Sequence, residues 1–230
     1  MRPIEKGNCP LDNEGKNIIF SSYGNAKPYL IDRIDSYCSF CERQSHSAAL
    51  EVEHILPKSL LQYTHLEKDW SNFLLACKNC NTIKSNNVFN EIYFPDKNNT
   101  FLAFQILEGG LVKVNTNLND NQRNKATNLM NLVGLDRRPG HVKFSIKDDR
   151  WLERKKIWEL AQKYKQKKLN GSMDDETIID FAKISGFWSV WFTVFADDTS
   201  IKNLLIQEFK GTAINGFQNT IPVNRNLNEL

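Results

Sequence analysis

The sequence predicts an α+β fold, in which a small module stapled by four cysteines precedes a mostly helical C-terminal half. Two Cys-x-x-Cys pairs, at 38–41 and 77–80, enclose a segment with the length and branched side chains of a β-strand. Beyond residue 119 the pattern is helical, with Asp, Ser or Thr at several expected helix starts and Gly at several ends. The chain is accordingly divided into a lead-in at 1–35, the module at 36–95 and a mainly helical domain at 96–230.

The lead-in is expected to be irregular, with turns at its glycines and a short helix near 26–34. Cys9, the fifth cysteine, lies in a Gly-Asn-Cys-Pro turn and has no paired neighbour in sequence. We expect it to be a free thiol.

The paired cysteines Cys38, Cys41, Cys77 and Cys80 predict a structural zinc site. Each Cys-x-x-Cys turn lets two thiolates converge on one ion, and two turns complete a closed tetrahedral site. The alternatives are disulfides or buried free thiols. We rank both lower, because we see no signal peptide and cytosolic thiols stay reduced. Structural zinc contributes about 10 to 16 kcal/mol of apparent binding energy in small peptides, so the ion would hold the module together.

Residues 49–56 are expected to form the first strand of the module, which Pro57 ends. Its two-residue period places Glu51 and Glu53 on one face. A second short strand is expected at 72–76 and a helix from about Asn81, just after the second cysteine pair.

The pair Glu53-His54 has the chemistry that phosphodiester hydrolysis requires. A neutral imidazole can take a proton from water near physiological pH. A carboxylate and an amide supply oxygen ligands, which suit Mg²⁺ or Mn²⁺ better than zinc and leave positions open for substrate. We expect Glu51 to be solvated or to support the metal ligands.

Taken together, Cys38-Ser-Phe-Cys41, Glu53-His54, Asn72 and Cys77-Lys-Asn-Cys80-Asn81 resemble the HNH endonuclease family. That resemblance implies a ββα-metal (HNH) module that holds one divalent ion against a scissile phosphate. It implies that His54 is the general base, that Glu53 and Asn81 hold the metal, and that Asn72 orients the loop carrying the histidine. The family more often has Asp where this chain has Glu53, a change that lengthens the ligand arm by one methylene.

Charge is distributed unevenly along the chain, whose formal net charge is +3. Residues 36–95 hold five Lys or Arg against six Asp or Glu, whereas 137–168 hold twelve against four. The second segment is the expected phosphate-binding surface, and the alternative is a solvated helix with lysines on every side. The candidates for phosphate contacts are Lys84 in the module and, in the second segment, Arg154, Lys155 and Lys156.

After the module we expect a hairpin within 101–114, around Glu108-Gly-Gly110, and then a series of helices. The expected helices are 119–134, 148–169, 174–185, 187–196 and 199–209. Large aromatic residues between 187 and 195 form one face at helical spacing. This predicts a buried helix or, as the alternative, a surface that docks a partner.

The opening Met-Arg-Pro-Ile, the HNH-like core and the helical C-terminal half are together similar to the nuclease subunit (PtuB-like) of Septu-type antiphage systems, which are also found beside retrons. This resemblance implies an ABC/SMC-like ATPase subunit as partner, with a retron reverse transcriptase and its RNA and DNA as further partners. The substrate would be DNA or RNA, including tRNA. Without an apolar run near the ~20 residues that span a bilayer, we expect a cytoplasmic protein. The rival functions are a non-catalytic nucleic-acid-binding adaptor and a stand-alone restriction endonuclease.

Overall fold

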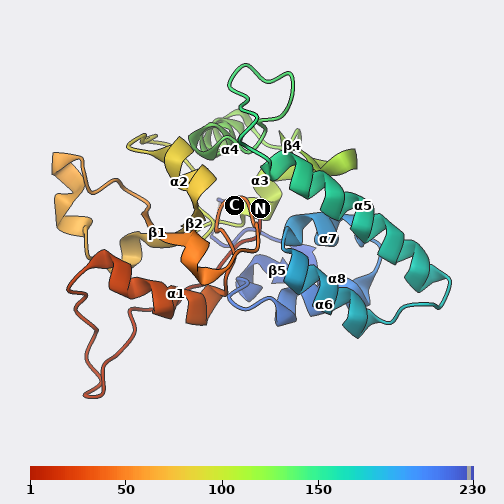
Figure 1. Cartoon of the computed structure of the whole chain (residues 1–230), viewed down its shortest axis with the longest axis horizontal. Coiled ribbons are helices and arrows are strands. Elements are labelled where there is room, and N and C mark those ends of the chain that lie inside the picture. The colour runs from red at the N-terminus through yellow and green to blue at the C-terminus, as the bar shows by residue number, and fades with distance from the viewer. Residues whose placement is uncertain (227–228) are drawn as a thin grey trace.

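The computed structural model describes residues 1–226 and 229–230 and confirms the α+β class (Figure 1). The helices are α1 (Lys27–Ile34), α2 (Lys78–Lys84), α3 (Thr100–Ala103), α4 (Asp120–Val133), α5 (Arg150–Leu169), α6 (Asp175–Ser185), α7 (Trp188–Val194) and α8 (Thr199–Glu208). The strands pair antiparallel: β1 (Leu50–His54) with β2 (Phe73–Cys77), β3 (Phe104–Leu107) with β4 (Leu111–Val114), and β5 (Phe217–Gln218) with β6 (Ile221–Pro222). Within this described part of the chain, no helix is both long and apolar enough to cross a bilayer.

Two expected elements need correction. Helix α2 begins at Lys78 rather than near residue 81, so Cys80 lies in its first turn. The expected hairpin begins later than residue 101, because the Asn99 side chain accepts a hydrogen bond from the Phe101 amide and caps the short helix α3. The hairpin strands then follow at β3 and β4. The division of the chain into 1–35, 36–95 and 96–230 stays a prediction.

The module is built on the β1–β2 pair, with His54 opposite Phe73 and Leu50 opposite Cys77. Every residue of β2 is buried. Helices α1 and α2 both contact it, and in Figure 1 they lie below and above the strand pair. A strand covered in this way reads as a continuous apolar run, which is what Phe-Leu-Leu-Ala-Cys shows. Since β2 is buried between two helices, Glu53 and His54 at the end of β1 lie on a well-packed strand pair.

Helices α5 to α8 pack around a second apolar cluster in which α7 is central. The side chains of Trp188, Trp191 and Phe192 are all buried, and the rings of Trp188 and Phe192 stack with centroids 4.5 Å apart. The buried-helix interpretation of 187–196 is therefore confirmed. The docking alternative is wrong, because this aromatic face lies in the chain's own core.

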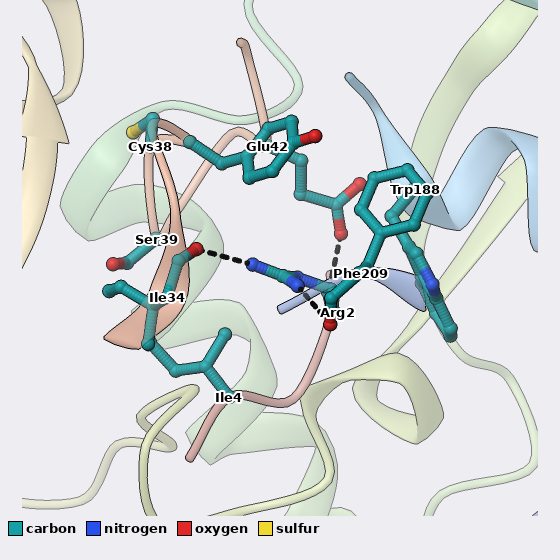
Figure 2. Close-up of a pocket in the computed structure, with 9 residues that line it drawn as sticks. Arg2, Ile4, Ile34, Cys38, Ser39, Glu42, Trp188 and Phe209 are labelled. Atoms are coloured by element: carbon teal, nitrogen blue, oxygen red, sulfur yellow. Dashed lines mark hydrogen bonds between the residues drawn. The ribbon is translucent and has the colours of Figure 1, made fainter. Parts of the chain in front are cut away.

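Glu42, in the first cysteine turn, connects the module to the C-terminal half (Figure 2). Its carboxylate accepts hydrogen bonds from the amide and hydroxyl of Ser189, at 3.0 and 2.6 Å, and from the Arg2 amide. The Arg2 guanidinium in turn donates to the carbonyls of Ile34 and Phe209, both at 3.2 Å. Segments far apart in sequence thus meet at one buried carboxylate.

Candidate metal centre and acid-histidine site

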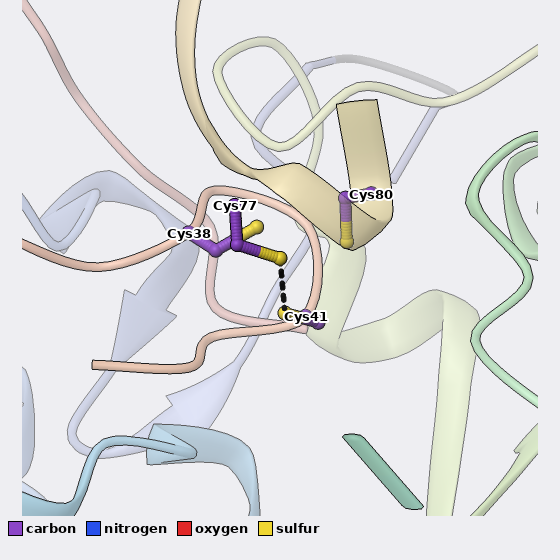
Figure 3. Close-up of side chains that lie close together, drawn as sticks. All are labelled: Cys38, Cys41, Cys77 and Cys80. Atoms are coloured by element: carbon purple, nitrogen blue, oxygen red, sulfur yellow. Dashed lines mark hydrogen bonds between the residues drawn. The ribbon is translucent and has the colours of Figure 1, made fainter. Parts of the chain in front are cut away.

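The four paired cysteines converge, as predicted, on one buried point (Figure 3). Their sulfur atoms all lie within 4.8 Å of one another, and those of Cys41 and Cys77 are 3.7 Å apart. Zinc–sulfur bonds of ~2.3 Å in tetrahedral geometry imply sulfur–sulfur distances of about 3.8 Å. Both the donor chemistry and the spacing therefore fit a structural zinc ion held by Cys38, Cys41, Cys77 and Cys80.

The distance between Cys41 and Cys77 also excludes a disulfide between them, since a disulfide bond is ~2.05 Å long. Cys9 lies outside the cluster, with its sulfur 3.7 Å from the carbonyl oxygen of Ile18. It is a free thiol.

Arg150, the first residue of α5, contacts the zinc cluster and was missed as part of it by the sequence analysis. Its guanidinium donates to the Cys80 sulfur at 3.0 Å and to the carbonyls of Val133 and Gly134 at 2.9 and 3.0 Å. The Asp148 carboxylate neutralises it, with bonds of 2.7 and 2.6 Å. A donor to a zinc-bound thiolate orients that ligand and reduces its charge. The only sequence signal was the local Asp148-x-Arg150 pair.

His54 ends β1 and is held by its ring nitrogen Nε2, which lies 2.9 Å from the carbonyl oxygen of Glu67. A carbonyl oxygen can only accept a hydrogen bond, so Nε2 carries the proton and Nδ1 keeps its lone pair. Tyr23 and Phe73 pack edge-on against the ring at 4.9 and 5.4 Å. Burial lowers the pKa of His54, which favours the neutral imidazole.

Asn72 is buried and clamps the loop that follows β1. Its side-chain oxygen accepts from the Leu56 amide at 2.8 Å, and its side-chain amide donates to the carbonyls of Leu56 and Leu66 at 3.0 and 3.3 Å. These contacts fix both ends of the loop that presents the Glu67 carbonyl to His54. The predicted role of Asn72 in orienting the histidine loop stays a prediction.

Glu53 and Lys84 form a buried ion pair, with Nζ and Oε1 2.7 Å apart. Lys84 is 0 % exposed, so its predicted contact with phosphate is wrong in this structure, since no substrate could reach the ammonium group. The residue lies one turn beyond Cys80, on the side of α2 that faces the strands, and sequence spacing alone does not reveal that burial. Burial raises the pKa of Glu53, and the charge of Lys84 opposes that rise.

Asn81 is brought to the strands as predicted, but its direct partner is Glu51 rather than Glu53, since its side-chain amide donates to Glu51 Oε2. Among the described residues, no hydrogen bond engages Glu53 Oε2 or Asn81 Oδ1. Two oxygen donors therefore remain on adjacent elements, which is the donor type that a hard divalent cation prefers. The predicted role of Glu53 and Asn81 as ligands of a divalent ion stays a prediction.

The basic residues of α5 do not act alike. Arg154 is buried and donates to the carbonyls of Gly110 and Leu135 at 2.5 and 3.0 Å, so its predicted phosphate contact is also wrong. Lys155 and Lys156 are exposed, and Lys155 lies 3.4 Å from Glu159. Their contact with phosphate stays a prediction.

Comparison with known families agrees with this geometry. Residues 38–87 match the family model described as HNH endonuclease. The match covers both cysteine turns, β1, β2 and α2, so this stretch is similar to the HNH endonuclease domain. No curated protein matches the chain.

Proposed function

We propose that the chain is an HNH endonuclease that hydrolyses phosphodiester bonds in nucleic acid, with His54 as general base. The observation that carries the proposal is the hydrogen bond from His54 Nε2 to the Glu67 carbonyl, which leaves Nδ1 as the basic nitrogen. Water is a poor nucleophile at neutral pH, and a positioned imidazole activates it by removing a proton.

The neighbouring residues have separable roles in this proposal. Asn72 keeps the loop closed around His54, so that the imidazole holds one orientation. Glu53 and Asn81 would hold the divalent ion through their free oxygens, with Glu51 positioning the Asn81 amide. When bound, Mg²⁺ or Mn²⁺ supplies positive charge where negative charge develops on the phosphate and the leaving oxygen.

The test is His54→Ala, assayed for cleavage of duplex DNA, single-stranded DNA and tRNA with magnesium or manganese. General-base catalysis contributes roughly 100- to 10,000-fold, so the rate should fall by that factor, while zinc content and circular dichroism stay unchanged. His46→Ala is the matched control, because His46 is exposed and outside the site. Near-normal cleavage by His54→Ala would remove this residue from the mechanism.

The second candidate is a binding module that kept the fold without cleavage, and the buried Lys84–Glu53 pair favours it. A carboxylate that is already paired with an ammonium group is expected to bind a metal ion less tightly. Calorimetric titration of the zinc-loaded protein with Mn²⁺ separates the two. A saturable site lost in Glu53→Gln supports the nuclease, and the absence of any Mn²⁺ site supports the adaptor.

We further propose that the enzyme is the effector of a bacterial, cytoplasmic antiphage complex with an ABC/SMC-like ATPase, beside a retron reverse transcriptase and its RNA and DNA in some arrangements. Two features support this: the similarity noted for the opening residues and architecture, and a module whose acids outnumber its basic residues. Such a module gains little from net charge when it meets a polyanion. Co-expression and pull-down with the product of the neighbouring gene is the test. A chain that binds no neighbour and cuts at full rate alone would instead be a stand-alone endonuclease.

A further inference from the structure

Helix α2 and the loop between α4 and α5 enclose a groove of about 390 Å³ outside the acid-histidine site. The loop projects from the molecule and is drawn in green in Figure 1. Lys78 and Thr82 line the groove from α2, and Arg137, Lys143 and Lys147 line it from the loop. Only α2 belongs to the HNH domain, so the groove joins that domain to a segment beyond it.

The groove is strongly cationic. In the part of the chain that the structure describes, none of Lys78, Arg137, Lys143 and Lys147 forms an ion pair. The one acid in its lining is Asp148, whose carboxylate is already engaged by Arg150. Four uncompensated positive charges around one hollow attract a polyanion more strongly than the same lysines scattered over a surface would.

Apolar side chains alternate with the lysines on the same loop. Val142 and Ile146 are 93 % and 90 % exposed and flank Lys143 and Lys147 in sequence. Water-exposed apolar tips among cations suit contact with sugars and base edges, while the lysines contact phosphate. This combination favours nucleic acid over a small anion.

Both ends of the loop are fixed to the rest of the molecule. At its start, the Arg137 side chain packs against Gly134: a Cβ added to Gly134 would lie 2.4 Å from Arg137 Nε. At its end, Arg150 holds the Val133 and Gly134 carbonyls and the Cys80 sulfur together. A loop that is held in place loses less conformational entropy when it binds a ligand.

We propose that this groove binds the phosphate backbone of the nucleic-acid substrate beside the scissile bond. Thr82 and Asn81 are consecutive on α2, and a helix with its side chains is only about 10–12 Å across, so the groove and the candidate metal ligand Asn81 occupy neighbouring faces of this helix. The proposal rests on the proposed nuclease function and adds the surface that holds the polymer in place.

The experiment measures binding in a His54→Ala background, so that cleavage does not interfere. Fluorescence anisotropy with labelled duplex DNA, single-stranded DNA and tRNA is recorded over a range of salt concentrations. The slope of log K against log salt is negative for nucleic-acid binding. In the triple variant Lys78→Gln, Lys143→Gln, Lys147→Gln its magnitude should fall by roughly 2.7 on duplex and roughly 2.1 on single strands. Because all three side chains are exposed, the melting temperature should not change.

A charge-matched control replaces Lys16, Lys97 and Lys210, exposed lysines outside the groove, by Gln. Its slope should stay at the parental value. A second arm, Lys155→Gln with Lys156→Gln, tests the surface of α5 expected from sequence.

Several results would overturn the proposal. These are an unchanged salt slope in the triple variant, an equal reduction of the slope in the control, a reduction only in the α5 variant, or no binding of nucleic acid by the parental protein. A triple variant that binds nucleic acid normally but no longer retains a co-expressed protein would make the groove a protein-docking surface, which also overturns the proposal. Failure of the nuclease function is read separately, as the absence of cleavage by the protein that retains His54.

Discussion

At the scale of single residues, the module depends on buried charges whose partners come from distant segments. Lys84 and Glu53 are both buried, and they come from α2 and β1 respectively. The sequence predicted that both residues would lie in the module, but it could not show that one neutralises the other. Charge counts record how many lysines a segment has, whereas burial depends on which face of α2 meets the strands. The same reason explains why Arg154 was predicted to contact phosphate although it is buried.

Lys84→Met should destabilise the protein by roughly 3 to 5 kcal/mol, because it leaves the Glu53 carboxylate buried without its cation. Urea unfolding followed by circular dichroism measures this loss. The double variant Lys84→Met, Glu53→Gln should recover part of it, since the uncompensated charge is gone. If Lys84→Met unfolds at the wild-type midpoint, the buried pair has no part in stability.

At the scale of secondary-structure elements, segment length, residue type and capping residues were sufficient to predict β1, β2, the hairpin strands and helices α4 to α8. What they could not predict is contact between elements. Phe187 N donates to the Glu42 carbonyl at 2.9 Å, so the turn between α6 and α7 packs directly on the first cysteine turn. Gly186 makes this approach possible, with φ 71° and no side chain.

Gly186→Ala should destabilise the fold for two reasons. It places a non-glycine residue at positive φ, which costs about 1 to 2 kcal/mol, and its Cβ would lie 2.6 Å from Gln44 N and 2.7 Å from Glu42 O. Gly171→Ala is the matched control, since Gly171 has φ 70° with nothing within 4 Å of the added Cβ. Thermal unfolding should show a larger loss for Gly186→Ala than for the control. Equal losses would mean that the backbone relaxes away from the contact.

At the scale of the whole molecule, the cysteine cluster is connected both to the C-terminal helices and to the end of α4. Glu42 connects it to Ser189 in the C-terminal half, and Arg150 connects Cys80 to the end of α4. Cys80→Ser should therefore abolish zinc binding and also loosen the aromatic cluster around Trp191, which lies in a different part of the sequence. Elemental analysis measures the zinc, and near-UV circular dichroism measures the tryptophan packing. Zinc loss with a native tryptophan spectrum would show that the two halves fold independently.

The hydrogen bond from Arg150 to the Cys80 sulfur has a thermodynamic consequence for the groove. The same guanidinium fixes the base of the projecting loop, so zinc occupancy and loop geometry share one residue. Two ligands that bias one arrangement are linked, and linkage is reciprocal: the factor by which zinc strengthens nucleic-acid binding equals the factor by which nucleic acid strengthens zinc binding. If the groove binds nucleic acid as proposed, a higher chelator concentration should be needed to extract half of the zinc from the nucleic-acid complex than from the free protein.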